Sequence, residues 1–141
     1  MAHSAPATST EPEEDAPHVI TFDTGAIIAV ERRTERMLRV MRMITGNSTP
    51  IIIPAVALAE WWRARPTQRM QTFLTGTTIE PVDATLASAA GEALAALPTA
   101  TIVDALVMAS AARSGGIVYT SDVGDLMTLQ THFRTVRVLA V

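Results

Sequence analysis

Five acidic residues stand where they could act together on a substrate. Asp23 directly follows the apolar run of residues 18–22, and Asp122 and Asp125 follow the run of residues 117–120. Glu60 and Asp104 are each the only charged residue within a long apolar stretch. A carboxylate in such surroundings is costly to bury unless it is paired or binds a cation. Grouped carboxylates repel one another, and Mg²⁺ or Mn²⁺ relieves that repulsion, so the pattern predicts a metal site suited to phosphoryl chemistry.

Each acid taken alone also fits an ordinary structural role. These roles are a capping box with Thr101 for Asp104, turn or N-cap positions for Asp23, Asp122 and Asp125, and an ion pair with Arg63 or another arginine for Glu60. Capping is the simpler explanation for Asp104 on its own. It does not explain why acids from four segments should gather in a chain without lysine and with few nearby bases.

The segments around these acids alternate between strand and helix patterns. Strands are predicted at residues 18–22, 50–53, 77–82, 117–120 and 136–141, and helices at residues 24–44 with a break near 33–34, 54–62, 67–74, 83–97, 102–113 and 125–130. Such alternation predicts an α/β fold with a mainly parallel five-stranded sheet covered on both faces. Ligands bind such sheets at the carboxyl ends of the strands, where the strand order reverses. Asp23 and Asp122 follow strands directly, and the helix of Asp104 must run back antiparallel to the next strand, so all three reach that edge.

The composition excludes several common chemistries. The chain of 141 residues contains no cysteine, which excludes disulfides, thiolate metal sites and cysteine nucleophiles. All 11 bases are arginine, which excludes a P-loop lysine and a Schiff-base lysine. None of the three histidines lies within the acidic motifs, so the ligand types disfavour zinc.

Residues 1–17 differ from the rest of the chain. They are rich in Ala, Ser, Thr, Pro and acid and show no apolar periodicity, which predicts a disordered acidic tail ahead of one domain at residues 18–141. The tail has neither the basic start nor the apolar run of a secretory signal. The longest uncharged stretch, residues 43–59, is too short and too interrupted by Gly and Pro to span a membrane. We therefore expect a cytoplasmic protein.

Arginines are concentrated in one half of the predicted domain, where eight of the 11 lie between positions 32 and 69. The spacing of Arg32, Arg36 and Arg39 predicts that they share one helical face. This face could hold RNA phosphates, or its arginines could pair with Glu31 and Glu35 in solvent.

Two sets of nonpolar residues lie close to these arginines. Met37, Met41 and Ile44 form another face of the same segment, suited to the core or to a partner helix. Trp61 and Trp62 are adjacent and therefore point in different directions. We expect one of them in the core and the other at a protein interface or stacked on a base.

The ordered set of acidic motifs resembles the PIN-domain nucleases, in particular the VapC-type toxins of bacterial toxin–antitoxin pairs. The motifs are DTG at Asp23, PAVALAE at Glu60, IVDAL at Asp104 and TSDVGDL at Asp122 and Asp125, and the likeness covers residues 19–141. It implies a three-layer α/β/α PIN-like fold and a Mg²⁺- or Mn²⁺-dependent endoribonuclease. In this reading the five acids are catalytic and hold the metal, and metal-activated water cleaves the RNA. Thr120 matches the Thr of the family's TxD pattern and could orient a carboxylate or a water.

The resemblance also implies partners. These are an RNA substrate, a VapB-type antitoxin whose tail fills the groove and often places a basic residue in the acidic site, and a second copy of the chain in a homodimer. Gly25 departs from the family pattern, because Ser is common after DT, and the departure weakens a hydroxyl contact without touching the acids.

Two other functions are compatible with the same residues. A catalytically silent PIN-like domain would bind RNA or a partner without cleaving RNA. A phosphatase with Asp23 as nucleophile is less favoured, because that chemistry typically needs a second acid two residues later, where Gly25 stands. RNA cleavage by the purified chain, with and without Asp23→Asn, separates the nuclease from the silent module.

Overall fold

The computed structural model describes residues 18–63 and 65–141, so the predicted tail at residues 1–17 lies outside the described part of the chain. The elements follow in the order β1 (Ile20–Phe22), α2 (Thr24–Arg32), α3 (Glu35–Asn47), β2 (Ile51–Pro54), α4 (Ala55–Trp61), α5 (Gln68–Thr75), β3 (Thr78–Glu80), α6 (Ala84–Ala96), α7 (Ile102–Arg113), β4 (Ile117–Thr120), α8 (Val123–Gln130) and β5 (Arg137–Ala140). This is the alternation of strand and helix that the sequence predicts.

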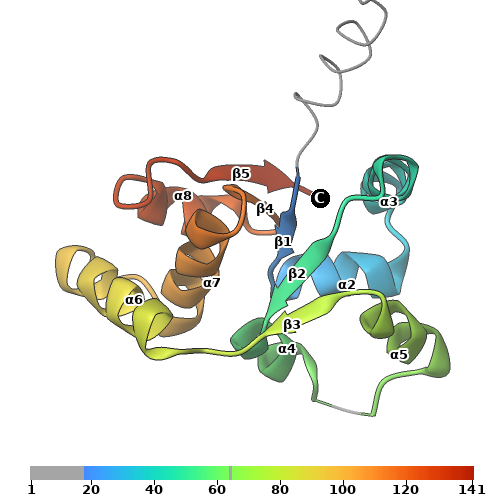
Figure 1. Cartoon of the computed structure of the whole chain (residues 1–141), viewed down its shortest axis with the longest axis horizontal. Coiled ribbons are helices and arrows are strands. Elements are labelled where there is room, and N and C mark those ends of the chain that lie inside the picture. Colours follow the sequence, from blue (N-terminus) through green and yellow to red (C-terminus); the bar gives the residue numbers. More distant parts are fainter. Residues whose placement is uncertain (1–17, 64) are drawn as a thin grey trace, which may run out of the picture.

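The five strands form one parallel sheet in the order β3-β2-β1-β4-β5 (Figure 1). In the central strand β1, Ile20 pairs with Ile51 of β2 and Phe22 pairs with Tyr119 of β4. All three residues of β1 are buried, because a central parallel strand is covered on both faces. The chain adds β2 and β3 on one side of β1 and then β4 and β5 on the other, so the strand order reverses between β1 and β4.

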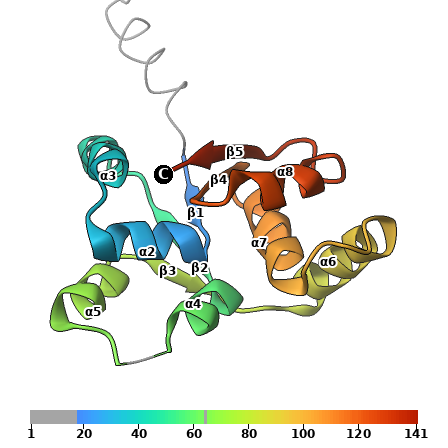
Figure 2. The same ribbon diagram turned by 180° about the vertical axis from the view of Figure 1, so that it is seen from behind.

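Helices cover both faces of the sheet. In the two opposite views, α2–α5 gather on one side and α6–α8 on the other (Figures 1 and 2). Right-handed crossovers produce this arrangement, because the chain crosses the sheet in one direction from β1 to β3 and in the other direction from β3 to β5. The three-layer α/β/α fold predicted from the sequence is therefore confirmed. Within residues 18–63 and 65–141, none of the helices combines the length and apolar character that a membrane span requires.

Short polar side chains begin five of these helices. Asp23, Thr34, Thr67, Asp83 and Thr101 each accept a hydrogen bond from a backbone N–H three residues further on, and so cap α2, α3, α5, α6 and α7. An N-cap of this kind stabilises a helix by about 1 kcal/mol. Capping is thus a real role of Asp23, and Thr101 is the cap of the helix that carries Asp104.

The predicted break near residues 33–34 separates α2 from α3. Arg33 has a φ of 54° and a ψ of 47°, in the left-handed region, and its N–H bonds to the carbonyl of Val30. This geometry ends α2, because the chain can no longer continue its helical path. Arg32 therefore belongs to α2, whereas Arg36 and Arg39 belong to α3. The prediction that these three arginines share one helical face is wrong, because the face is interrupted at the break.

The ends of several elements differ from the predicted ends. Pro54 is the last residue of β2, where it pairs with Glu80 of β3, and the following helix begins at Ala55. That helix ends at Trp61, because the backbone of Trp62 leaves the helical region. Proline lacks an N–H in either setting, so its sequence position does not distinguish the end of a strand from the start of a helix.

The methionine face of α3 belongs to the core, which is one of the two settings predicted for it. Met37 and Ile44 are buried in the core and Met41 packs against it. Trp61 is half-buried and packs against the same core, whereas Trp62 is 48% exposed. The two adjacent tryptophans thus have different surroundings, since consecutive side chains cannot face the same way.

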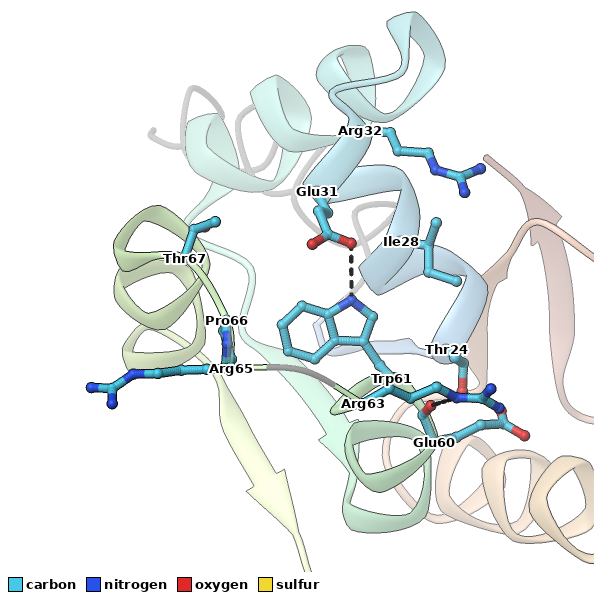
Figure 3. A pocket seen from close by; sticks show the side chains of 10 residues that line it. All are labelled: Thr24, Ile28, Glu31, Arg32, Glu60, Trp61, Arg63, Arg65, Pro66 and Thr67. Carbon is cyan, nitrogen blue, oxygen red and sulfur yellow. Dashed lines mark hydrogen bonds between the residues drawn. The ribbon is translucent and has the colours of Figure 1, made fainter.

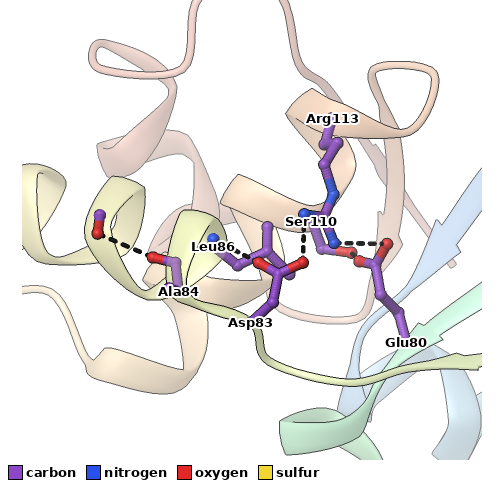
Figure 4. A network of polar contacts seen from close by, with 7 residues as sticks. Glu80, Asp83, Ala84, Leu86, Ser110 and Arg113 are labelled. Carbon is purple, nitrogen blue, oxygen red and sulfur yellow. Dashed lines mark hydrogen bonds and ion pairs between the residues drawn. The ribbon is translucent and has the colours of Figure 1, made fainter.

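A polar network fixes the edge of the sheet to α7 (Figure 4). The guanidinium of Arg113 lies 3.0 Å from a carboxylate oxygen of Glu80 in β3 and 2.8 Å from one of Asp83. The buried hydroxyl of Ser110 donates to the Glu80 carboxylate. Because α7 is held at this end, the position of its first turn relative to the sheet is also fixed.

Candidate active site

The five predicted acids line one cavity of about 280 Å³. Asp23 follows β1, Asp122 and Asp125 lie at the start of α8 after β4, Asp104 lies in the first turn of α7, and Glu60 lies in the last turn of α4. The cavity is therefore at the carboxyl edge of the sheet, beside the reversal of strand order between β1 and β4, where ligand sites of parallel sheets form. Its other polar side chains are the hydroxyls of Thr24, Thr101 and Ser121, and no basic side chain is in its lining.

Asp23 is the most deeply placed of the five acids, with 8% of its surface exposed. One of its carboxylate oxygens accepts the N–H of Ala26 at 2.9 Å, and the Thr120 hydroxyl also bonds to the carboxylate. Burial raises the pKa of Asp23 to about 6, against the lowering effect of these hydrogen bonds, and the charge of Asp104 adds to the rise. A negative charge at Asp23 is therefore unfavourable unless a cation compensates it.

Asp104 is half-buried, and the other acids act on it directly. Burial is the largest cause that raises its pKa, and a hydrogen bond with Thr101 opposes the rise. The charges of Asp125, Glu60 and Asp122 raise the pKa further. Thr101 caps the first turn of α7 by accepting the N–H of Asp104 at 3.1 Å, and its side-chain hydrogen bond to the carboxylate holds Asp104 beside the other acids.

Asp122 and Asp125 are exposed at the mouth of the cavity. Asp122 occupies the N-cap position of α8 but makes no side-chain cap hydrogen bond, so its carboxylate is not used to begin that helix. A hydrogen bond with Asp122, together with its charge, raises the pKa of Asp125. These two acids are therefore paired with each other rather than with the helix end.

Glu60 is held by a hydroxyl group and not by a base. The Thr24 hydroxyl donates to a carboxylate oxygen of Glu60 at 2.6 Å (Figure 3). Arg63 donates from Nε to the backbone carbonyl of Glu60 at 3.1 Å, and among the described residues no ion pair reaches the Glu60 carboxylate. The ion pair with Arg63 that the sequence left open is therefore absent from this part of the chain.

Thr120 lies behind the cavity and connects two of its acids. It is fully buried, its hydroxyl bonds to the Asp23 carboxylate, and its oxygen accepts the N–H of Asp122 at 2.9 Å. It is not in the cavity lining, so it positions Asp23 and the β4–α8 turn rather than touching a substrate. The resemblance allowed Thr120 to orient either a carboxylate or a water. Its contacts favour orientation of the Asp23 carboxylate.

Gly25 and Ser121 fit together across the cavity. A Cβ at position 25 would lie 2.1 Å from the Ser121 hydroxyl oxygen and 2.9 Å from the Ser121 backbone nitrogen. A side chain there would collide with the β4–α8 turn, which explains why glycine stands where the family commonly has serine. The sequence did not single out Ser121 or Thr24, because each becomes relevant only through a contact with a distant segment.

The donor set of the cavity suits a hard divalent cation, since carboxylate and hydroxyl oxygens line it and bases do not. The side chains are not already closed around one point: across residues 18–63 and 65–141, no three His, Cys, Asp or Glu side chains converge tightly enough to enclose a metal ion. Mutual repulsion of the acids and the hydrogen bond of Glu60 to Thr24 are physical reasons for this spacing. The residues fit a metal by chemistry, and their role as ligands stays a prediction.

The arginines predicted to bind RNA are divided between two places. Arg32 lines a second cavity, of about 520 Å³, that also includes Thr24 and Glu60 of the acidic cavity (Figure 3). Arg36 and Arg39 do not line the acidic cavity, and Arg39 lies 3.8 Å from Glu35 in an exposed pair. Such an exposed pair contributes little to stability. Of the three, only Arg32 is placed at a cavity that joins the acids.

Comparisons with known proteins yield structural likeness only. No protein-family model matches the sequence, and no curated protein matches it either. A chain of VapBC2 from Rickettsia felis, solved bound to a DNA fragment from its promoter, is similar with a TM-score of 0.68 at 15% identity over 87% of this chain and 98% of that chain. DNA-bound VapBC from Salmonella typhimurium gives a TM-score of 0.64 at 17% identity, with coverage of 86% and 96%.

A third likeness is to VapBC-5 from Mycobacterium tuberculosis, a member of the VapBC family of toxin–antitoxin systems, with a TM-score of 0.59 at 22% identity and coverage of 89% and 100%. At such identities the likeness is evidence of fold. Because the matches cover nearly the whole of each neighbour, this chain has the complete three-layer α/β/α PIN-like fold that these toxin–antitoxin structures contain.

Proposed function

We propose that this chain is a Mg²⁺- or Mn²⁺-dependent endoribonuclease that serves as the toxin of a toxin–antitoxin pair. The observation that carries the proposal is the single cavity in which acids from four separate segments meet without a base. The likeness of the fold to chains of VapBC complexes supports the toxin role.

The residues of the cavity have distinct parts in this proposal. Asp23, Glu60, Asp104, Asp122 and Asp125 would hold the cation. The bound cation would lower the pKa of an attacking water and neutralise charge on the phosphate. Thr120, Thr101 and Thr24 position the carboxylates of Asp23, Asp104 and Glu60 through the hydrogen bonds described above. Placement by hydroxyl groups leaves the negative charge of the acids uncompensated, as a cation site requires.

An apolar groove beside α3 is the proposed seat of the antitoxin. It has a volume of about 540 Å³ and is lined by Val30, Met37, Leu38, Met41, Phe73, Thr72, Arg33 and Arg69. Leu38 is 44% exposed there. An apolar groove with an exposed leucine at its surface is suited to the apolar face of a partner helix. We propose a VapB-type antitoxin as that partner and, from the family resemblance, a homodimer of the toxin.

The cleavage assay uses purified full-length chain, single-stranded RNA and either Mg²⁺, Mn²⁺ or EDTA. We expect cleavage with metal, none with EDTA, and a loss of cleavage in Asp23→Asn. The matched control is Asp83→Asn, which alters an aspartate N-cap of the same geometry outside the cavity lining. Loss of cleavage in both variants would indicate a general structural effect.

Two outcomes would contradict the proposal. Cleavage that survives both EDTA and Asp23→Asn would show that the cavity is not the active site. Tight RNA binding without cleavage in any metal would favour the silent PIN-like module, which the open spacing of the acids also suits.

A further inference from the structure

The acidic cavity continues into two neighbouring cavities of different chemistry. On one side it shares Thr24 and Glu60 with the cavity of about 520 Å³ around Trp61. On the other side it shares Thr101, Asp104 and Asp125 with a cavity of about 160 Å³. Because neighbouring cavities share lining residues, the three lie side by side with the acids in the middle, and we refer to them together as the groove.

The cavity around Trp61 contains an aromatic ring that is already held in place. The indole N–H of Trp61 donates to a carboxylate oxygen of Glu31 at 3.2 Å (Figure 3). The ring of Trp62 meets it edge to face, with centroids 6.1 Å apart and an angle of 85° between the planes. Because the ring is fixed before a ligand arrives, stacking on it costs little additional side-chain entropy.

The same cavity contains three arginines, Arg32, Arg63 and Arg65. None of them forms an ion pair with a carboxylate in the described part of the chain. The Glu31 carboxylate accepts the Trp61 N–H, and the Glu60 carboxylate accepts the Thr24 hydroxyl. The guanidinium charges therefore remain available to an anionic ligand, within one cavity of an aromatic ring.

The opposite arm of the groove has no such groups. Its lining consists of Thr99, Ala100, Thr101, Asp104, Asp125 and Thr128, without an arginine or an aromatic ring. A polynucleotide lying along the groove would find a base-stacking surface and positive charge on one side of the acids only. Recognition should therefore be one-sided, with a single flanking nucleotide dominating.

We propose that the cavity around Trp61 is a nucleotide subsite, which takes one unpaired base on the Trp61 ring and the neighbouring backbone phosphates on Arg32, Arg63 and Arg65. The proposal rests on the proposed function, because it places the bond to be cleaved at the acids. Base stacking on an aromatic side chain requires an unstacked base, so the ligand is single-stranded RNA rather than duplex. The apolar groove lined by Met37 and Met41 is a separate cavity, and its chemistry suits the antitoxin better.

The first test measures binding without cleavage. Full-length chain in EDTA is titrated into fluorescein-labelled oligouridylate and oligoadenylate of about 12 nucleotides, within the span that single-stranded binders cover, and anisotropy is recorded. We expect Trp61→Leu to weaken binding by about tenfold to one-hundredfold, the usual effect of losing one stacked base. Trp62→Leu is the matched control, because Trp62 is adjacent, exposed and outside the cavity lining. It removes one of the two contacts that hold the Trp61 ring but leaves the ring itself, so its affinity should fall much less than that of Trp61→Leu.

A second measurement locates the base. The affinity is measured for a series of oligonucleotides in which a single abasic site is moved along the strand. At one position the abasic site should weaken binding by the wild-type protein but should not weaken binding by Trp61→Leu any further. Trp62→Leu leaves Trp61 as the only tryptophan of the chain, and its fluorescence should be quenched when RNA binds. Trp61→Phe keeps a ring and should retain most of the affinity, which gives a reading even if Trp61→Leu does not fold.

The arginines are tested by salt dependence. Arg32→Gln combined with Arg65→Gln should reduce the slope of log affinity against log salt by about 1.4, since each phosphate contact contributes about 0.7 on a single strand. Both residues are exposed, so the fold should persist.

Several results would overturn the subsite. These are unchanged RNA affinity in folded Trp61→Leu, an equal loss in Trp62→Leu, binding of duplex RNA as tight as of single strands, or a salt slope that the arginine substitutions leave unchanged. If Trp61→Leu lost binding to an antitoxin peptide but kept its affinity for RNA, the cavity would be assigned to a protein partner instead. The binding assays contain no metal, so failure of the cleavage assay with these results intact would reject the nuclease and keep the subsite.

Discussion

Replacing Asp23 with asparagine should stabilise the metal-free protein at neutral pH, although it removes a residue proposed to be essential. Asp23 is buried, and its burial raises the pKa of the carboxyl group from 3.8 to about 6. Asparagine has nearly the same shape, carries no charge and keeps an oxygen that can accept the N–H of Ala26, so the N-cap of α2 is retained. The substitution therefore isolates the cost of the buried charge.

The sign and size of the effect follow from the shifted pKa. Because the pKa is higher in the folded than in the unfolded chain, the folded state favours the protonated acid, and stability falls as the pH rises from about 4 to about 6. Asparagine does not titrate. Asp23→Asn should therefore exceed the wild type in free energy of unfolding by about 3 kcal/mol at pH 8, and by only about 1 kcal/mol at pH 4.5.

Urea unfolding in EDTA at the two pH values measures this difference. Asp83→Asn is the control of opposite sign, because its hydrogen bond with Leu86 and its contact with Arg113 lower the pKa of Asp83, and its charge stabilises the fold above pH 4. That variant should lose stability at pH 8. Mg²⁺ or Mn²⁺ should stabilise the wild type and not Asp23→Asn, since only a ligand bound to the folded state shifts unfolding. An Asp23→Asn protein that is less stable than the wild type at pH 8 in EDTA would refute the reasoning.

Three further changes test other parts of the structure. The Thr21 hydroxyl is buried without a hydrogen-bond partner among the described residues, so Thr21→Val should raise the free energy of unfolding by about 1 kcal/mol, measured by urea unfolding. Gly25→Ala should lower stability by about 1–3 kcal/mol and reduce RNA cleavage, because its Cβ would displace Ser121, and adding Ser121→Gly should restore part of both; unchanged cleavage would contradict the close fit. Arg113→Gln should lower the melting temperature, because Glu80 at 14% side-chain exposure loses its ion pair, and a melting temperature equal to that of the wild type would show that the network adds nothing.

The parallel sheet and its helices were predictable because their residues act locally. The β-branched runs at 51–53 and 117–120 lie in buried strands, and Thr67, Asp83 and Thr101 are caps whose side chains act three residues away. The meeting of the acids at one edge was also predictable, because parallel strands align their carboxyl ends. Local rules, applied in order along the chain, are sufficient for these features.

Other features depend on contacts between segments far apart in the chain. The prediction of a single arginine face is wrong because one residue, Arg33, takes a left-handed conformation that helical spacing does not reveal. The collision that reserves position 25 for glycine involves Ser121, and the hydroxyl that holds Glu60 comes from Thr24 of another helix. The groove that joins Trp61 to the acids arises where α2, α4 and the carboxyl edge of the sheet come together.

Residue order was therefore enough to name the acids, the strands that carry them and the edge at which they meet, since periodicity and capping are properties of short segments. Folding alone set how buried each acid is, which hydroxyl holds it and which cavity lies beside it. These quantities depend on the distances between segments that are remote along the chain, and burial of Asp23, rather than its identity, is what makes its charge costly.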